Sequence, residues 1–99
     1  MNRTGLLNNI TIAQYRQILH TIGFSRDKVK YRKYTVWRNY YTTSEHIEEL
    51  DKLVDLGVMN KSDRLDTWQN CVIYFVTDLG LEFVSECENV KIIKEKANA

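Results

Sequence analysis

One stretch of this 99-residue chain sets its fold class. Residues Cys71–Thr77 (Cys-Val-Ile-Tyr-Phe-Val-Thr) are β-branched and aromatic, which is the composition of a well-buried strand. Thr77 can then cap a helix over about Asp78–Glu86, with Leu79 and Phe83 facing inward. A buried strand that runs directly into an amphipathic helix predicts an α+β domain.

A first helix is predicted near the start of the chain. Thr11 and Gln14 fit a capping box, in which each side chain satisfies the backbone N–H of the other residue. Apolar residues follow at helical spacing over Ile12–Ile22, and Gly23 is suited to end the helix. We therefore place this helix at about Ile12–Ile22.

A second clear helix is acidic. Thr42 and Glu45 form another capping box, and Gly57 ends the helical pattern. One face carries the apolar stripe Ile47, Leu50, Leu53 and Val54. Acids occupy the opposite face, which we expect to be solvated.

The segment between these helices is ambiguous. Residues Val29–Trp37 alternate loosely, as in a strand, whereas Tyr34, Trp37 and Tyr41 also fit a helical spacing. Period alone does not decide between the two for a short aromatic segment. We predict a short helix near Tyr34–Tyr40, after a loop.

The order of these elements resembles that of a winged-helix domain. Leu50–Met59 (Leu-Asp-Lys-Leu-Val-Asp-Leu-Gly-Val-Met) looks like the end of a third helix. Tyr74–Gly80 (Tyr-Phe-Val-Thr-Asp-Leu-Gly) looks like the last wing strand turning into a helix. The resemblance implies one winged-helix-like domain over residues 1–99, with three helices, a short β-hairpin wing and a C-terminal helix. We expect the leader 1–9 and the tail 94–99 to be flexible.

The predicted core combines the apolar faces of these helices with the strand. Its members are Leu19, Ile22, Ile47, Leu50, Leu53, Val54, Ile73, Phe75 and Phe83.

A closer resemblance is to small proteins encoded in bacteriophages and prophages, in families of unknown function. It spans about Gln14–Val84 and is carried by Arg38–Tyr41 (Arg-Asn-Tyr-Tyr), the acid-rich stripe, Leu-Val-x-x-Gly-x-Met and Phe-Val-Thr-x-x-Gly. The chain departs from the pattern in the basic run Lys28–Thr35. The resemblance implies a phage or prophage origin and carries over no functional residue.

Charge is divided between two segments. From Arg26 to Arg38 the chain carries six cations and one acid, with tyrosines and Trp37 within the run or just after it. From Glu45 to Asp66 it carries seven acids and three cations. The formal net charge of +1 therefore conceals a basic and an acidic surface.

Catalytic and metal-binding patterns are weak. His20 and His46 have no nearby Ser or Cys nucleophile in the sequence, and we interpret both as structural or solvated. Asp63 and Asp66 lack the ligand density of a calcium loop, and no phosphate-binding glycine-rich loop occurs. The sequence predicts a non-enzymatic protein without a metal or cofactor.

The remaining composition favours the cytoplasm of a bacterial host. Cys71 and Cys87 form no Cys-x-x-Cys pair, and two reduced thiols are favoured over one disulfide. The N-terminus lacks the apolar region of a signal peptide, and no apolar run approaches the roughly 20 residues that cross a bilayer.

Two functions fit the charge pattern. We favour binding to a host or phage protein through charged surfaces, which would also allow homodimers. The alternative is a nucleic-acid-binding regulator that uses the basic segment 26–38. An acidic third helix disfavours reading of the major groove, because its carboxylates would repel phosphates. The candidate contact residues are Lys28, Lys30, Arg32, Lys33, Trp37, Arg38 and Tyr41, and the acidic face consists of Glu45, Glu48, Glu49 and Asp55. A plainer interpretation is that the aromatic residues pack in the core while the cations stay solvated.

Overall fold

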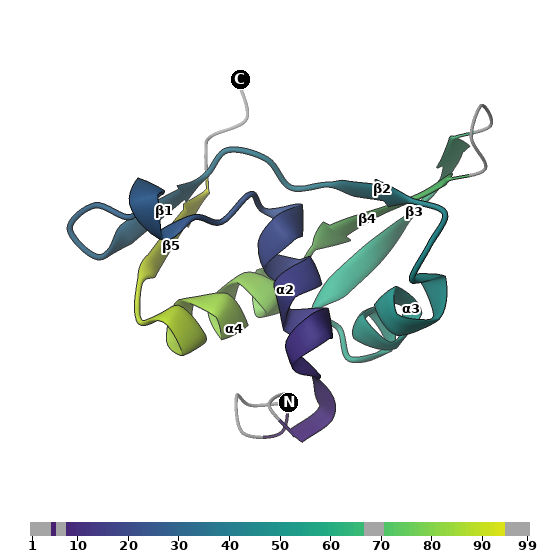
Figure 1. Ribbon diagram of the computed structural model, residues 1–99, viewed down its shortest axis with the longest axis horizontal. Helices are drawn as coiled ribbons and strands as arrows, with labels where there is room; N and C mark the ends of the chain where they lie inside the picture. The colour runs from purple at the N-terminus through teal and green to yellow at the C-terminus, as the bar shows by residue number, and fades with distance from the viewer. Residues whose placement is uncertain (1–4, 6–7, 67–70, 95–99) are drawn as a thin grey trace.

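The computed structural model describes residues 5, 8–66 and 71–94, which form an α+β domain with strands in two sheets (Figure 1). Its helical elements are α2 (Ile12–Thr21), the 3-10 turn η1 (Arg26–Lys28), α3 (Ile47–Asp55) and α4 (Asp78–Glu88). Its strands are β1 (Lys33–Val36), β2 (Tyr41–Thr43), β3 (Met59–Asp66), β4 (Cys71–Val76) and β5 (Lys91–Lys94).

The two sheets differ in kind. The larger one is antiparallel with the order β2-β4-β3, whereas β1 and β5 form a parallel pair in which Lys33 faces Lys91 and Val36 faces Lys94. Figure 1 shows the β1–β5 sheet and α3 at opposite ends of the longest axis, along which the Cα atoms extend 41 Å. The parallel pair was not predicted from the sequence.

The starts of α2 and α4 follow the predicted capping. The Gln14 backbone N–H donates to Thr11 Oγ1 at 3.1 Å, and the Thr11 N–H donates to Gln14 Oε1 at 2.9 Å. The Gly80 N–H donates to Thr77 Oγ1 at 3.2 Å. A Cβ atom on Gly80 would lie 2.2 Å from the Val58 carbonyl oxygen. Only glycine at position 80 therefore allows α4 to pack this closely against the residue before β3.

The predicted helix at Tyr34–Tyr40 is wrong, because this stretch begins as strand β1. Tyr34 and Val36 are buried while Lys33 and Thr35 are exposed, which is the period of a strand. The buried Tyr34 hydroxyl donates to the Ile22 carbonyl at 2.8 Å and so ties β1 to the end of α2. Pairing with β5, which is distant in sequence, selected the strand.

The predicted capping box at the start of α3 is also wrong. Thr42 lies in β2, and the N-cap of α3 is His46, which has a left-handed backbone and makes no side-chain capping bond. Thr43 instead stabilises the approach to the helix, since its Oγ1 accepts from the Glu45 N–H at 2.9 Å.

The core contains most of the predicted residues. Ile22, Leu50, Leu53 and Phe83 are buried, and Leu19, Ile47 and Val54 pack against them in half-buried positions. Ile73 and Phe75 were wrongly assigned, because Tyr74 and Val76 are the residues of β4 that join the core. Alternate residues of a strand face opposite sides, so an apolar run cannot place all of its side chains in one core.

A single side chain joins the link between β1 and β2 to the larger sheet. Asn39 Nδ2 donates to the Val76 carbonyl at 3.0 Å, and the Val76 N–H donates to Asn39 Oδ1 at 2.7 Å. This carboxamide therefore acts as one further backbone rung beside β4.

The chain ends are only partly described. Gly5, Asn8 and Asn9 of the predicted leader are helical, and Lys94 of the predicted tail closes β5 and forms an ion pair with Asp78. Residues 1–4, 6–7 and 95–99 lie outside the described residues. Neither cysteine is in a disulfide; Cys71 is buried and Cys87 is half-buried.

Candidate binding surfaces

A tight turn projects from the β1–β5 sheet. Lys30 and Lys33 exchange both backbone hydrogen bonds at 2.9 Å, with only Tyr31 and Arg32 between them. Tyr31 (φ 53°) and Arg32 (φ 60°) have the left-handed backbone of a type I′ turn, which favours Asn and Gly over bulky residues. The Tyr31 side chain gains no burial in return, since the residue is 94% exposed.

Cations surround this turn. Lys30, Arg32 and Lys33 are exposed, and β5 adds the exposed Lys91, whose backbone N–H donates to the Arg32 carbonyl at 2.8 Å. Across the described part of the chain, none of these four side chains forms an ion pair. We call Lys28, Lys30, Arg32, Lys33, Arg38 and Lys91 the basic end of the molecule.

Lys91 was missed because only a long-range pairing brings it to Lys33. The one available signal was the pair of β-branched residues that follows it, Ile92 and Ile93, which is typical of a short strand. That signal does not say which strand is the neighbour. In the ladder, Lys33 and Lys91 are in register, so two like charges stand side by side.

Trp37 is half-exposed, and its ring makes contacts with Gly23 and Lys28. Its Nε1 donates to the Gly23 carbonyl at 3.2 Å, and a Cβ atom at Gly23 would lie 2.6 Å from the ring. The Lys28 ammonium lies 4.2 Å from the ring centroid. A nucleobase that stacked on the face of Trp37 under Lys28 would displace this cation–π contact.

Arg38 and Tyr41 belong to different surroundings. The Arg38 guanidinium lies 4.8 Å from the Tyr40 ring centroid and donates through Nη2 to the Tyr40 carbonyl at 3.1 Å. Tyr41 is half-buried in β2 and packs on the core, with its ring centroid 5.0 Å from that of His20. Of the predicted contact residues, Tyr41 is the one that packs against the core instead of joining the basic end.

Arg26 lies in the basic segment of the sequence, but its charge is paired. Its Nη2 atom lies 3.0 Å from Glu88 Oε1 and also donates to the Glu88 carbonyl at 3.1 Å. The other Glu88 oxygen accepts from the Tyr15 hydroxyl at 2.7 Å. Burial first, and then this acceptor, raise the pKa of Tyr15, so its hydroxyl stays protonated and acts as a donor.

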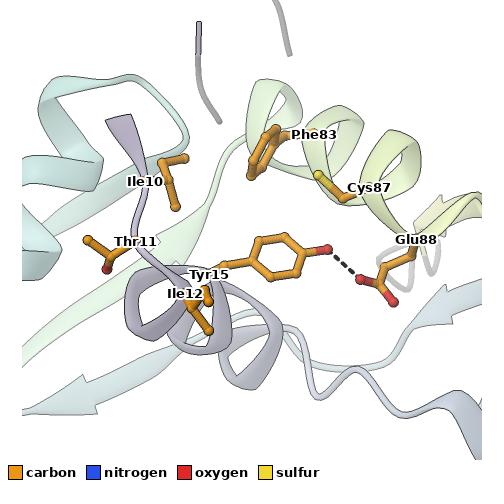
Figure 2. Close-up of a pocket in the computed structure, with 7 residues that line it drawn as sticks. All are labelled: Ile10, Thr11, Ile12, Tyr15, Phe83, Cys87 and Glu88. Carbon is orange, nitrogen blue, oxygen red and sulfur yellow. Dashed lines mark hydrogen bonds between the residues drawn. The ribbon is translucent and has the colours of Figure 1, made fainter. Parts of the chain in front are cut away.

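This hydrogen bond crosses a pocket of about 390 Å³ between the start of α2 and α4 (Figure 2). The pocket is lined by Ile10, Thr11, Ile12, Tyr15, Phe83, Cys87 and Glu88. Figure 2 shows the Tyr15 ring reaching across towards Glu88, with Phe83 above it. Glu88 is already engaged by Tyr15 and Arg26, so its carboxylate is poorly suited to act as a general base.

The acidic end of the molecule is α3 with the residue pair before it. Glu48, Glu49 and Asp55 are exposed, and no ion pair engages them among the residues that the structure describes. Glu45 is also exposed and lies 3.9 Å from the His46 ring nitrogen. The outward charge of α3 is therefore negative, as the sequence predicted.

Asp51 is the acid of α3 that turns to the sheet. It accepts from the Tyr74 hydroxyl at 2.8 Å and from the Lys61 ammonium at 3.0 Å. These two donors, the Tyr74 bond foremost, lower the pKa of Asp51. Burial of Tyr74 first, and then the same contact, raise the pKa of that phenol.

The described residues contain no cluster of three or more His, Cys, Asp or Glu side chains that could hold a metal ion. Within the same residues, no helix has both the length and the apolar character needed to cross a bilayer.

The chain matches no protein-family model, no curated protein and no solved structure. Its function must therefore be inferred from the chemistry of its own surfaces.

Proposed function

We propose that this chain is a small non-enzymatic binding protein of phage or prophage type, with a winged-helix-like fold, that docks on an acidic surface of a host or phage protein. The order β2-β4-β3 and the positions of α2 and α3 are compatible with a winged helix. One helix, α3, stands between β2 and β3, where a winged helix commonly has two.

One observation carries the proposal. The basic end gathers five exposed cations and the half-buried Arg38, none with an acidic partner within the described residues, beside exposed Tyr31, Trp37 and Tyr40. Tyrosine, tryptophan and arginine are the residue types that dominate binding energy at protein interfaces. A complementary acidic surface would both speed encounter and fix the orientation of the two partners.

The experiment is affinity capture from the bacterial host with the purified chain as bait and nuclease in the lysate. The double variant Arg32→Glu with Lys33→Glu should lose the captured protein. Glu48→Lys with Glu49→Lys changes charge by the same amount at the acidic end and should retain it. Equal capture by all three baits would contradict docking through the basic end.

A nucleic-acid-binding regulator is the second candidate, because the same cations could neutralise phosphates. The exposed acids of α3 and the Lys28 cover on Trp37 favour the protein partner. A gel-shift titration with generic duplex DNA separates the candidates. Binding that weakens steeply with salt and is lost in the Arg32→Glu, Lys33→Glu variant would establish the second function instead.

A further inference from the structure

The strand β5 has one free side. It pairs with β1 alone, and the described residues place no strand along its other edge. Since the Lys91 N–H bonds towards β1, strand alternation turns the backbone groups of Ile92 and Lys94 away from β1. An edge of this kind is a template for a further strand.

A groove runs along this free edge, with α4 as its second wall. Among the residues that the structure describes, a depression of about 310 Å³ is lined by residues of α4 and β5, namely Asp78, Leu81, Glu82, Ser85, Lys91, Ile92 and Lys94. Leu81 is buried and Ile92 is half-buried, so both give the groove an apolar lining. An extended chain between an edge strand and a helix is an established geometry for peptide recognition.

The groove has two different ends. At one end the Lys94–Asp78 ion pair joins β5 to α4. At the other, a second hollow of about 440 Å³ is lined by Arg32, Ser85, Glu86, Asn89, Val90 and Lys91. The two depressions share Ser85 and Lys91, so they adjoin one another along the start of β5.

The second hollow has the chemistry of a carboxylate site. Arg32 and Lys91 supply two cations that no ion pair engages in the described part of the chain, and the side chain of Asn89 adds an amide. Glu86 lines the same hollow, and its charge disfavours a doubly charged phosphate more than a singly charged carboxylate. The strained backbone of Arg32 is consistent with a side chain that is held for binding.

Strand direction connects these features. β5 runs from Lys91 to Lys94, so an antiparallel peptide beside it would end at Lys91 and Arg32. We infer that the groove between β5 and α4 binds the extended C-terminal segment of a partner protein as an added antiparallel strand, with its terminal carboxylate between Arg32 and Lys91. At about 3.3 Å per residue, β5 would accommodate roughly four or five residues. This inference rests on the proposed function and names where the partner's chain is held.

The test is a titration of the ¹⁵N-labelled chain, followed by amide chemical shifts. The probes are two equimolar pools of random heptapeptides, one with free C-terminal carboxylates and one amidated. The free-carboxylate pool should shift the amides of Ile92 and Lys94, together with those of Arg32 and Asn89. Amidation should weaken the effect about tenfold, as expected for the loss of one charged hydrogen-bonded contact. Unmoved β5 amides, or equal shifts with both pools, would overturn the inference.

Variants give a second measurement. Arg32→Gln and Lys91→Gln should each reduce binding of the free-carboxylate pool to the level of the amidated pool. Lys52→Gln removes the same charge from the exposed side of α3, away from the groove and the basic end, and should leave binding unchanged. Suppose that the Lys91→Gln variant captures the partner as well as wild type does, and that the peptide pools leave the β5 amides unmoved. The proposed function would then stand, and binding in the groove would be refuted. If no bait captures a protein while the free-carboxylate peptides still bind, the groove would stand and the proposed function would be refuted.

Discussion

The two ends of the molecule are built by different means. At the acidic end, Leu50 and Leu53 are completely buried, and α3 rests on the core through them. At the basic end, a turn of bulky left-handed residues and a two-stranded parallel sheet carry side chains that are mostly exposed, and Tyr34 is the main anchor. The contrast indicates that the acidic end is held by burial, whereas the basic end carries two adjacent left-handed residues, Tyr31 and Arg32, where the acidic end has one, His46. Costs of this kind commonly gather where a protein binds something.

The largest expected effect tests the anchoring of the acidic end. Leu53→Ala removes a fully buried side chain of α3 and should lower the free energy of unfolding by about 2–5 kcal/mol. Urea denaturation followed by circular dichroism measures this loss. Ile12→Ala is the matched control, because Ile12 is 74% exposed, and it should change stability by less than about 0.5 kcal/mol. A similar small loss for Leu53→Ala would mean that α3 is not held by this face.

The next effect has the opposite sign and tests strain at the basic end. Replacing Tyr31→Asn together with Arg32→Gly supplies the residues that a type I′ turn prefers, and it should raise the free energy of unfolding by about 1–2 kcal/mol. The same denaturation assay measures the gain. Tyr31→Phe keeps the bulky residue and should leave stability unchanged. A net loss of stability in the double variant would show that the native side chains support the turn.

The smallest effect concerns pH and the inward acid of α3. The pKa of Asp51 is lowered in the folded protein, first by the Tyr74 hydroxyl and then by Lys61, so its stabilisation is present above the unfolded value of 3.8 and is lost as pH falls through the lowered folded value. Asp51→Asn should flatten the decline in stability between about pH 5 and about pH 2.

Its effect at neutral pH should stay below about 1 kcal/mol, because the Asp51 side chain is 42% exposed. Denaturation midpoints across a pH series measure both quantities, and Asp55→Asn, an exposed acid of the same helix, serves as the control. Equal slopes for wild type and Asp51→Asn would refute this account of the carboxyl.

Local chemistry made the helices and one strand predictable. Thr11 with Gln14 and Thr77 with Gly80 mark real helix starts, and the apolar stripe of Leu50 and Leu53 marks the buried face of α3. The acidic face was predictable for the same reason, since it lies opposite that stripe.

Long-range pairing was not predictable from local pattern. The segment around Tyr34 and Val36 is compatible with a helix or a strand by local pattern, and pairing of β1 with β5 decides for the strand. Lys91 joins the basic end only through that pairing. The inward residues of β4 were misassigned because every position of that strand is apolar or aromatic, which conceals the alternation. The groove beside β5 depends on both of these non-local facts.

The carboxamide of Asn39 makes the link between β1 and β2 sensitive to deamidation. An amide can both give and receive a hydrogen bond, which is what the backbone of Val76 requires of it. Hydrolysis to a carboxylate would leave an acceptor facing the Val76 carbonyl oxygen, and two oxygens would then repel one another. Ageing at one side chain could thus loosen the connection between the segment that carries Trp37 and Arg38 and the rest of the protein, without touching any charged residue.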